Sequence, residues 1–233
     1  MKTISKLIFA VLMLAGVSRS YAAVETRNVG SFSSIEASGS FDVYITQTGT
    51  ESVKVDAPAD MMEKIKTEVS GGVLKLYTKG SWKDWSFFGD HKKVVIYVTA
   101  KQLNGVGLTG SGDVVLKNTI NSESFKARIS GSGDFTGSVN TKELEVGISG
   151  SGDMRLSGKA NTSAVRLSGS GDYDGKNLVT ASTSVHISGS GDASINASNS
   201  VDASVSGSGD VRYTGGATNV HSSSSGSGDV RRM

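Results

Sequence analysis

Residues 146–156 read Val-Gly-Ile-Ser-Gly-Ser-Gly-Asp-Met-Arg-Leu, and apolar residues alternate with polar or small ones on both sides of the tetrapeptide Gly-Ser-Gly-Asp. A period of two is typical of a β-strand with one buried face. Continued through the tetrapeptide, the alternation puts both glycines on the inner face and both serines and the aspartate on the outer face. Inward positions without side chains suit a corner where the backbone bends close to the core. The stretch therefore predicts a strand that bends at its glycines.

This tetrapeptide occurs seven times in the chain, at intervals of 18 to 21 residues. A repeat of this length indicates a solenoid, in which stacked coils share a continuous core. Equivalent strands would stack in parallel, and parallel connections are almost always right-handed. The repeats therefore predict an all-β fold, a right-handed parallel β-helix with about 19 residues per rung. The aspartates of the seven repeats are Asp113, Asp134, Asp153, Asp172, Asp192, Asp210 and Asp229.

The regular repeats occupy residues 101–233, whereas residues 23–100 are less regular but still strand-like. Residues 41–45, 52–55, 73–77 and 94–98 alternate or run apolar, and residues 58–65 fit a short helix with Pro58 in its first turn. No linker separates the two parts. We therefore expect one β-helix domain over residues 23–233, with longer and irregular N-terminal rungs.

Residues 1–22 have the features of a secretory signal peptide. Lys2 and Lys6 precede 11 apolar residues, and the small residues Ser20 and Ala22 precede the expected cleavage site. No later segment approaches the roughly 20 apolar residues of a membrane-spanning helix. The protein is therefore expected to be exported, and to be periplasmic, associated with the outer surface or secreted.

Composition and motifs argue against several classes of function. The formal net charge of +2 argues against nucleic-acid binding driven by charge, and the lack of cysteine excludes disulfides and thiol nucleophiles. The three histidines are far apart, and no Gly-x-Ser-x-Gly, His-Glu-x-x-His or phosphate-loop motif occurs. We therefore expect a protein that is not an enzyme. A polysaccharide-active enzyme remains the least favoured alternative, because parallel β-helices include such enzymes.

Stacked rungs would align the seven repeat aspartates in a column with carboxylates about 5 Å apart. Their mutual repulsion is tolerable if the carboxylates are solvated, hydrogen-bonded or bridged by cations. Calcium is one interpretation, since it takes carboxylate and carbonyl oxygens as ligands. Hydrogen bonds from turn amides are the other. We favour the hydrogen bonds and expect no cofactor.

Two surfaces are candidates for ligand contact. A segment between two predicted strands contains Trp82, Trp85, Phe87 and Phe88 beside several lysines. These aromatic residues could stack on sugars or anchor a protein, or they could cover one end of the core. The outward serines and aspartates of the repeats form the second candidate, a flat array that could meet a glycan, a mineral or another surface. The alternative is a solvated face.

The opening of the chain adds a resemblance to these patterns. Residues 27–35 read Arg-Asn-Val-Gly-Ser-Phe-Ser-Ser-Ile, and residues 36–45 read Glu-Ala-Ser-Gly-Ser-Phe-Asp-Val-Tyr-Ile. Together with the repeats, they make residues 26–230 similar to the head GIN domain family of autotransporter adhesins from Bacteroidetes-type envelopes. The resemblance implies a right-handed β-helix, a surface or envelope location and an adhesin role, and it brings no catalytic residues. An autotransporter needs a membrane-inserting translocator, and we expect none in this sequence. We therefore expect that a partner anchors the protein, or that the protein is periplasmic or released.

These observations lead to one main expectation and one alternative. We expect an exported, non-enzymatic, adhesin-like β-helix that binds a glycan or an envelope or surface protein. The alternative is a structural module of the cell envelope that self-associates end to end or through its strand edges.

Overall fold

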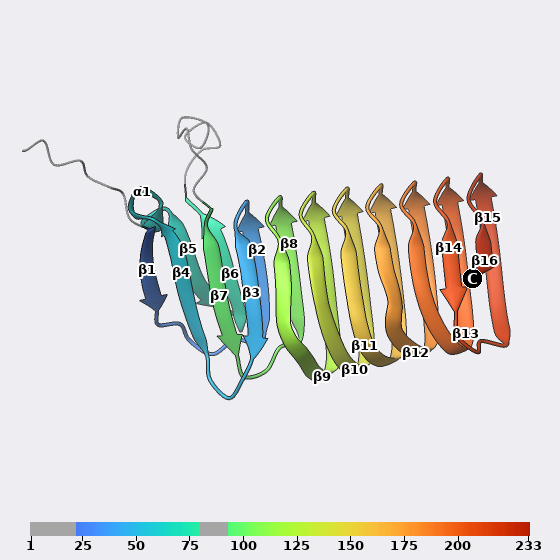
Figure 1. Cartoon of the computed structure of the whole chain (residues 1–233), viewed down its shortest axis with the longest axis horizontal. Helices are drawn as coiled ribbons and strands as arrows, with labels where there is room; N and C mark the ends of the chain where they lie inside the picture. Colours follow the sequence, from blue (N-terminus) through green and yellow to red (C-terminus); the bar gives the residue numbers. More distant parts are fainter. Residues whose placement is uncertain (1–21, 80–92) are drawn as a thin grey trace, which may run out of the picture.

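Strands dominate the computed structural model, which describes residues 22–79 and 93–233 (Figure 1). Within this part of the chain, sixteen strands join into one hydrogen-bonded network. The network coils into a parallel β-solenoid of about seven turns with about 19 residues per rung. The predicted parallel β-helix is therefore confirmed.

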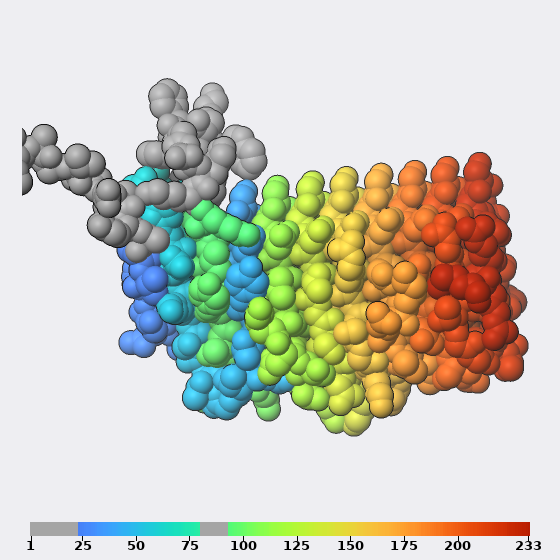
Figure 2. Space-filling view, viewed as in Figure 1, coloured from blue at the N-terminus to red at the C-terminus, as the bar shows by residue number. Residues whose placement is uncertain are grey.

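Each regular rung is a single long strand that curves around the core between two Gly-Ser-Gly-Asp turns. The half of the strand before a turn pairs with the equivalent halves of its neighbours, and the half after a turn forms a second series of pairs. We call these series the pre-turn ladder and the post-turn ladder. The tight turns line up along one edge of the solenoid, the upper edge in Figure 1, and form a row of small projections along the same edge in Figure 2. The strands of this part are β8 (Gly105–Gly110), β9 (Val114–Gly131), β10 (Phe135–Gly150), β11 (Met154–Gly169), β12 (Tyr173–Gly189), β13 (Ala193–Gly207), β14 (Val211–Thr214), β15 (Asn219–Gly226) and β16 (Val230–Arg232).

The core lies between the two ladders and is made of columns of equivalent side chains. In β10 and β11, for example, Val146 pairs with Val165 and Ile148 pairs with Leu167, and all four side chains are buried. The positions directly after the turns, such as Phe135 and Met154, complete the core from the post-turn ladder. Apolar residues at alternate positions thus pack against apolar residues of the next rung, as the period-two pattern predicts.

The two turn glycines are required by the close stacking of the turns. Gly150 has a φ of +124°, and a Cβ added there would lie 2.3 Å from the carbonyl oxygen of Gly131. A Cβ on Gly152 would lie 2.1 Å from the carbonyl oxygen of Gly133. The predicted bend at the glycines is confirmed. Gly152 is buried as expected, whereas Gly150 is only half-buried.

In the N-terminal part, the strands do not follow one another along the solenoid in the order of the chain. Its β2 and β3 lie between the layer of β6 and β7 on one side and that of β8 and β9 on the other. Three strand pairs are antiparallel: β1 with β4, β4 with β7, and β5 with β6. Gly71 and Gly72, both at positive φ, form the tight connection between β5 and β6. The elements are β1 (Ala22–Arg27), β2 (Ser34–Gly39), β3 (Asp42–Gln47), β4 (Ser52–Pro58), α1 (Ala59–Met62), β5 (Ile65–Ser70), β6 (Val73–Thr78) and β7 (Val95–Ala100).

The last rung keeps the register of the solenoid without its apolar side chains. Ser222 and Ser224 of β15 pair with the core residues Ala203 and Val205 of β13, and both serines are exposed. No further rung follows β15 and β16 within the described chain. The described part of the chain also has no helix of the length and apolarity needed to cross a membrane.

Candidate ligand-binding groove

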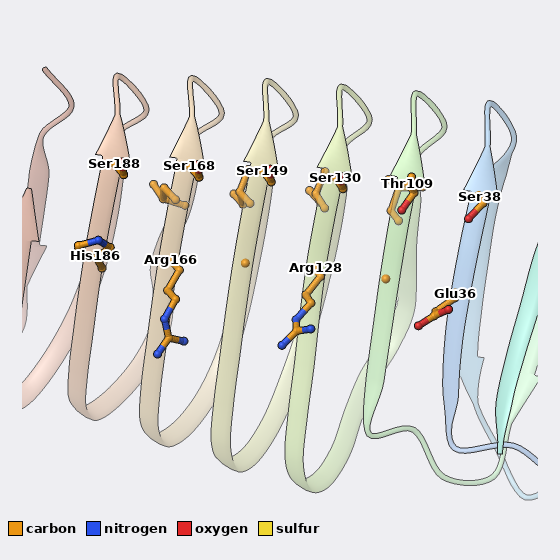
Figure 3. A pocket seen from close by; sticks show the side chains of 16 residues that line it. Glu36, Ser38, Thr109, Arg128, Ser130, Ser149, Arg166, Ser168, His186 and Ser188 are labelled. Atoms are coloured by element: carbon orange, nitrogen blue, oxygen red, sulfur yellow. The ribbon is translucent and has the colours of Figure 1, made fainter. Parts of the chain in front are cut away.

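A shallow groove of about 490 Å³ runs across the outer surface of the pre-turn ladder (Figure 3). Six neighbouring strands contribute to it: β2, β8, β9, β10, β11 and β12. With strands about 4.8 Å apart, five spacings make the groove roughly 24 Å long. It therefore runs along the axis of the solenoid, perpendicular to its strands.

Two columns of outward-facing residues line the groove. The column nearest the tight turns consists of hydroxyl side chains, all exposed: Ser38, Thr109, Ser130, Ser149, Ser168 and Ser188. The second column lies two residues earlier in each strand and holds Glu36, Gly107, Arg128, Gly147, Arg166 and His186. The two arginine side chains extend along their strands away from the turns (Figure 3). The groove thus combines a row of hydroxyls with spaced cations.

The glycines of the second column create hollows between the charged side chains. Gly107 lies between Glu36 and Arg128, and Gly147 lies between Arg128 and Arg166. A Cβ on Gly147 would come no closer than 3.5 Å to any atom, the nearest being Cγ of Arg128, which is an ordinary contact. Unlike the turn glycines, Gly147 is therefore not required by the backbone, and a side chain there would fill part of the groove.

The two arginines of the groove differ in their partners. Arg128 Nη2 lies 2.6 Å from Oε1 of Glu145, and Lys126 Nζ lies 3.0 Å from Oε2 of the same carboxylate. These hydrogen bonds, first from Arg128 and then from Lys126, hold the pKa of Glu145 below its ordinary value. Arg166 is exposed, and no hydrogen bond or ion pair joins it to another described residue. Positive charge is therefore available at Arg166.

The seven repeat aspartates form the expected column, and their carboxylates bond to the backbone. The amide of Asp172 donates to Oδ1 of Asp153 at 3.0 Å, and each repeat aspartate from Asp134 onward donates in the same way to its predecessor. Arg212 also bridges Asp192 and Asp210, at 3.1 Å from each carboxylate. In the described chain, no three His, Cys, Asp or Glu side chains are grouped to hold a metal ion. The donors thus come from the turn of the next rung, and calcium at this column stays the alternative that we do not favour.

The structure bears differently on the two predicted contact surfaces, the aromatic segment and the array of outward serines and aspartates. Trp82, Trp85, Phe87 and Phe88 lie outside the described residues. The array of serines and aspartates does not form one flat face, because the chain turns sharply between its members. Ser149 lies in the pre-turn ladder and lines the groove, whereas Asp153 lies beyond the bend beside the post-turn ladder.

Neither the arginines of the groove nor a pair of tyrosines on the post-turn ladder belongs to a motif that the sequence makes conspicuous. Arg128 and Arg166 each lie two residues before an outward serine, and their alternation with glycine is the signal that could have revealed them. Tyr44 and Tyr97 stack with their ring centroids 5.6 Å apart. Lys117 Nζ lies 5.2 Å from the Tyr44 centroid and Lys54 Nζ lies 5.9 Å from that of Tyr97. Because ammonium groups lie over both rings, we regard this cluster as a structural support of the sheet.

Comparisons with known proteins agree with the fold. A crystal structure of a putative adhesin from Bacteroides fragilis superposes with a TM-score of 0.86 at 27% identity, covering 91% of this chain and 97% of that one. A putative lipid binding protein from Parabacteroides distasonis gives a TM-score of 0.75 at 20% identity, covering 92% and 98%. A putative adhesin from Parabacteroides merdae gives 0.73 at 19% identity, covering 92% and 97%. The two likenesses at or below 20% identity support the fold alone. No curated protein matches significantly.

The family comparison covers most of the solenoid. Residues 31–217 match the family described as "Putative auto-transporter adhesin, head GIN domain". The match begins just before β2 and reaches past β14, so it includes every strand that lines the groove. The resemblance seen in the sequence is therefore confirmed, and this chain belongs to the head GIN domain family.

Proposed function

We propose that this protein is an exported, non-enzymatic, adhesin-like solenoid that binds a surface ligand through the groove of the pre-turn ladder. The observation that carries the proposal is the groove itself, which six neighbouring strands line with exposed hydroxyl and charged side chains. Sheet strands hold these side chains at fixed spacings, so a ligand meets a preorganised surface. Family membership and the likeness to a putative adhesin support the same role and an exported or surface location.

Binding to an array of glycans and surface proteins tests this function. The wild-type protein is compared with Gly147→Leu, which should fill the hollow between Arg128 and Arg166 without straining the backbone. We expect the array to contain a ligand whose signal falls in the variant. A ligand bound equally well by both proteins would show that the groove is not the binding site. The same array read with calcium and with chelator tests whether the aspartate column binds metal.

Envelope assembly is a second candidate function, favoured by the open ends of the solenoid. In the described chain, β15 and β16 pair with one neighbour each at one end, and β1 and β5 do so at the other. Such edges can pair with strands of another copy. Sedimentation velocity over a range of protein concentrations tests this idea. Concentration-dependent growth into larger species supports assembly, whereas a constant monomer contradicts it.

A further inference from the structure

The groove has the dimensions of a site for an extended chain. Its modest volume of about 490 Å³ is spread over six strands, which corresponds to a length of roughly 24 Å. A compact small molecule would occupy only a fraction of this length. A peptide lying along the groove would cross the strands at a right angle, so it could not add to the ladder as a further strand. The shape therefore favours a linear, non-peptide polymer lying parallel to the solenoid axis.

The polar groups of the groove match those of a carbohydrate. Hydroxyls occur on every strand, and strands are about 4.8 Å apart, so the row offers donors and acceptors at short, regular intervals. Between them the lining is mostly apolar, because Gly107 and Gly147 have no side chains and a leucine or isoleucine of β8, β9, β10 and β11 also lines the groove. Sugar rings present hydroxyls at their edges and C–H groups on their faces. A polysaccharide can therefore satisfy both kinds of surface in one orientation.

The charges of the groove between β9 and β12 favour an acidic ligand, whereas Glu36 lies at the opposite end, on β2. Arg128 and Arg166 lie two strands apart, which is roughly 9.6 Å. Arg166 is exposed and has no ion-pair partner among the described residues, and His186 lies next to it in register. Arginine holds carboxylates through two parallel hydrogen bonds. In an extended glycan, acidic sugars that recur every one or two units carry carboxylates at spacings of this order.

We propose that the groove binds a linear acidic polysaccharide, a polyuronate, along the solenoid axis. Arg166 holds one carboxylate, and Arg128 meets the carboxylate two sugar units further toward β9 by exchanging part of its contact with Glu145. The serine row bonds to the sugar hydroxyls. This inference rests on the proposed binding function and adds the chemical class of the ligand.

Polygalacturonate, titrated calorimetrically into the purified protein at low salt, is the direct probe. We expect binding that weakens as salt is raised, because counterions screen the exposed arginines. Arg166→Gln should weaken it about tenfold or more, the usual range for loss of a charge-assisted hydrogen bond. Glu145→Gln should strengthen it, because Arg128 and Lys126 lose a competing carboxylate.

Arg155→Gln is the matched control, since Arg155 is on the same strand as Arg166 but in the post-turn ladder. Arg155 is also exposed and has only a 3.6 Å ion pair with Asp153. The control variant should bind like the wild type. Equal losses in Arg155→Gln and Arg166→Gln would indicate unspecific charge attraction and would overturn the proposal. Thermal unfolding of each variant verifies that its fold is intact.

Two further probes separate this inference from the proposed function. The first is the same polymer with its carboxyl groups reduced to alcohols, and the second is a vesicle of phosphatidylglycerol. Binding of the reduced polymer equal to that of polygalacturonate overturns the acidic class, while its loss in Gly147→Leu would still support the groove. Binding of vesicles without binding of polygalacturonate overturns the inference in favour of a lipid. No binding of polygalacturonate also overturns it, whereas the array tests the broader function independently.

Discussion

The buried hydroxyl of Tyr173 allows a test of whether a polar group without a hydrogen-bond partner destabilises the solenoid core. Tyr173 is the first residue of β12, its side chain is 2% exposed, and its Oη has no hydrogen-bond partner among the described residues. The equivalent position two rungs earlier is Phe135, which is fully buried. Tyr173→Phe therefore removes one oxygen and gives the position a side chain that the same column already accepts.

Burying a hydroxyl without a partner costs about 1–3 kcal/mol. Removing it should raise the free energy of unfolding by about 1–2 kcal/mol, since the phenylalanine ring keeps the packing. For a chain of this size, that corresponds to an increase in melting temperature of about 2–8 °C. Circular dichroism with heat and with urea measures both quantities. Tyr97→Phe is the control, because its side chain is 42% exposed and should change stability by no more than about 0.5 kcal/mol.

The pH dependence offers an independent readout. Burial, and then the charge of Asp174, raise the pKa of Tyr173 well above its usual value of 10. The folded state therefore keeps this proton where the unfolded state loses it. Ionisation of this group leaves the free energy of unfolding unchanged below pH 10, and the free energy of unfolding falls as the pH rises further, by up to about 1.4 kcal/mol per pH unit. Tyr173→Phe should remove that alkaline loss. A variant that is less stable than the wild type at pH 7 would refute the reasoning and would point to a buried partner for the hydroxyl.

Three further predictions concern the turns and the charges. Gly171→Ala should destabilise the protein by about 3 kcal/mol or more, because its Cβ would lie 2.2 Å from a backbone oxygen, whereas Gly147→Ala should change urea stability little. Asp153→Ala should lower the free energy of unfolding by about 1 kcal/mol, because the amide of Asp172 loses its acceptor, Oδ1 of Asp153. Asp153→Asn keeps an acceptor oxygen and should restore most of this loss. Equal losses in the two variants would contradict the hydrogen-bond ladder. Since the pKa of Glu145 is lowered, its ion pairs stabilise the fold above about pH 4.3 and are lost as the pH falls below that value. Glu145→Gln should therefore lower urea stability at pH 7 by about 0.2–1 kcal/mol, and its difference from the wild type should shrink as the pH falls below that value.

The regular half of the fold could be predicted closely from its repeats. The position after each aspartate was expected to face the core, and Phe135, Met154 and Tyr173 are all buried there. The period of two determines which face each side chain takes, and the recurring glycines determine where the chain bends. Both are local properties of the backbone, so they can be read from residues adjacent in sequence.

The candidate site was only partly predictable. The outward serines were identified as a contact surface, but their separation from the aspartates depends on the sharpness of the turn, which places the two on different sides of a corner. The importance of Arg166 depends on what surrounds it on neighbouring strands. Among the described residues, Arg166 has no acidic side chain within ion-pair distance. That isolation is a property of the folded surface, and the sequence of a single strand does not contain it.

By itself, the sequence determined the repeat, the inward and outward alternation, the bends at the glycines and the family. Only the tertiary structure decided the order of the N-terminal strands, because β2 and β3 fit between elements that follow them in the chain. That insertion brings Tyr44 against Tyr97 and places Glu36 at one end of the groove. Such contacts join residues far apart in sequence. They are determined by the core surface that each strand buries against its neighbours, and no local pattern of residues specifies them.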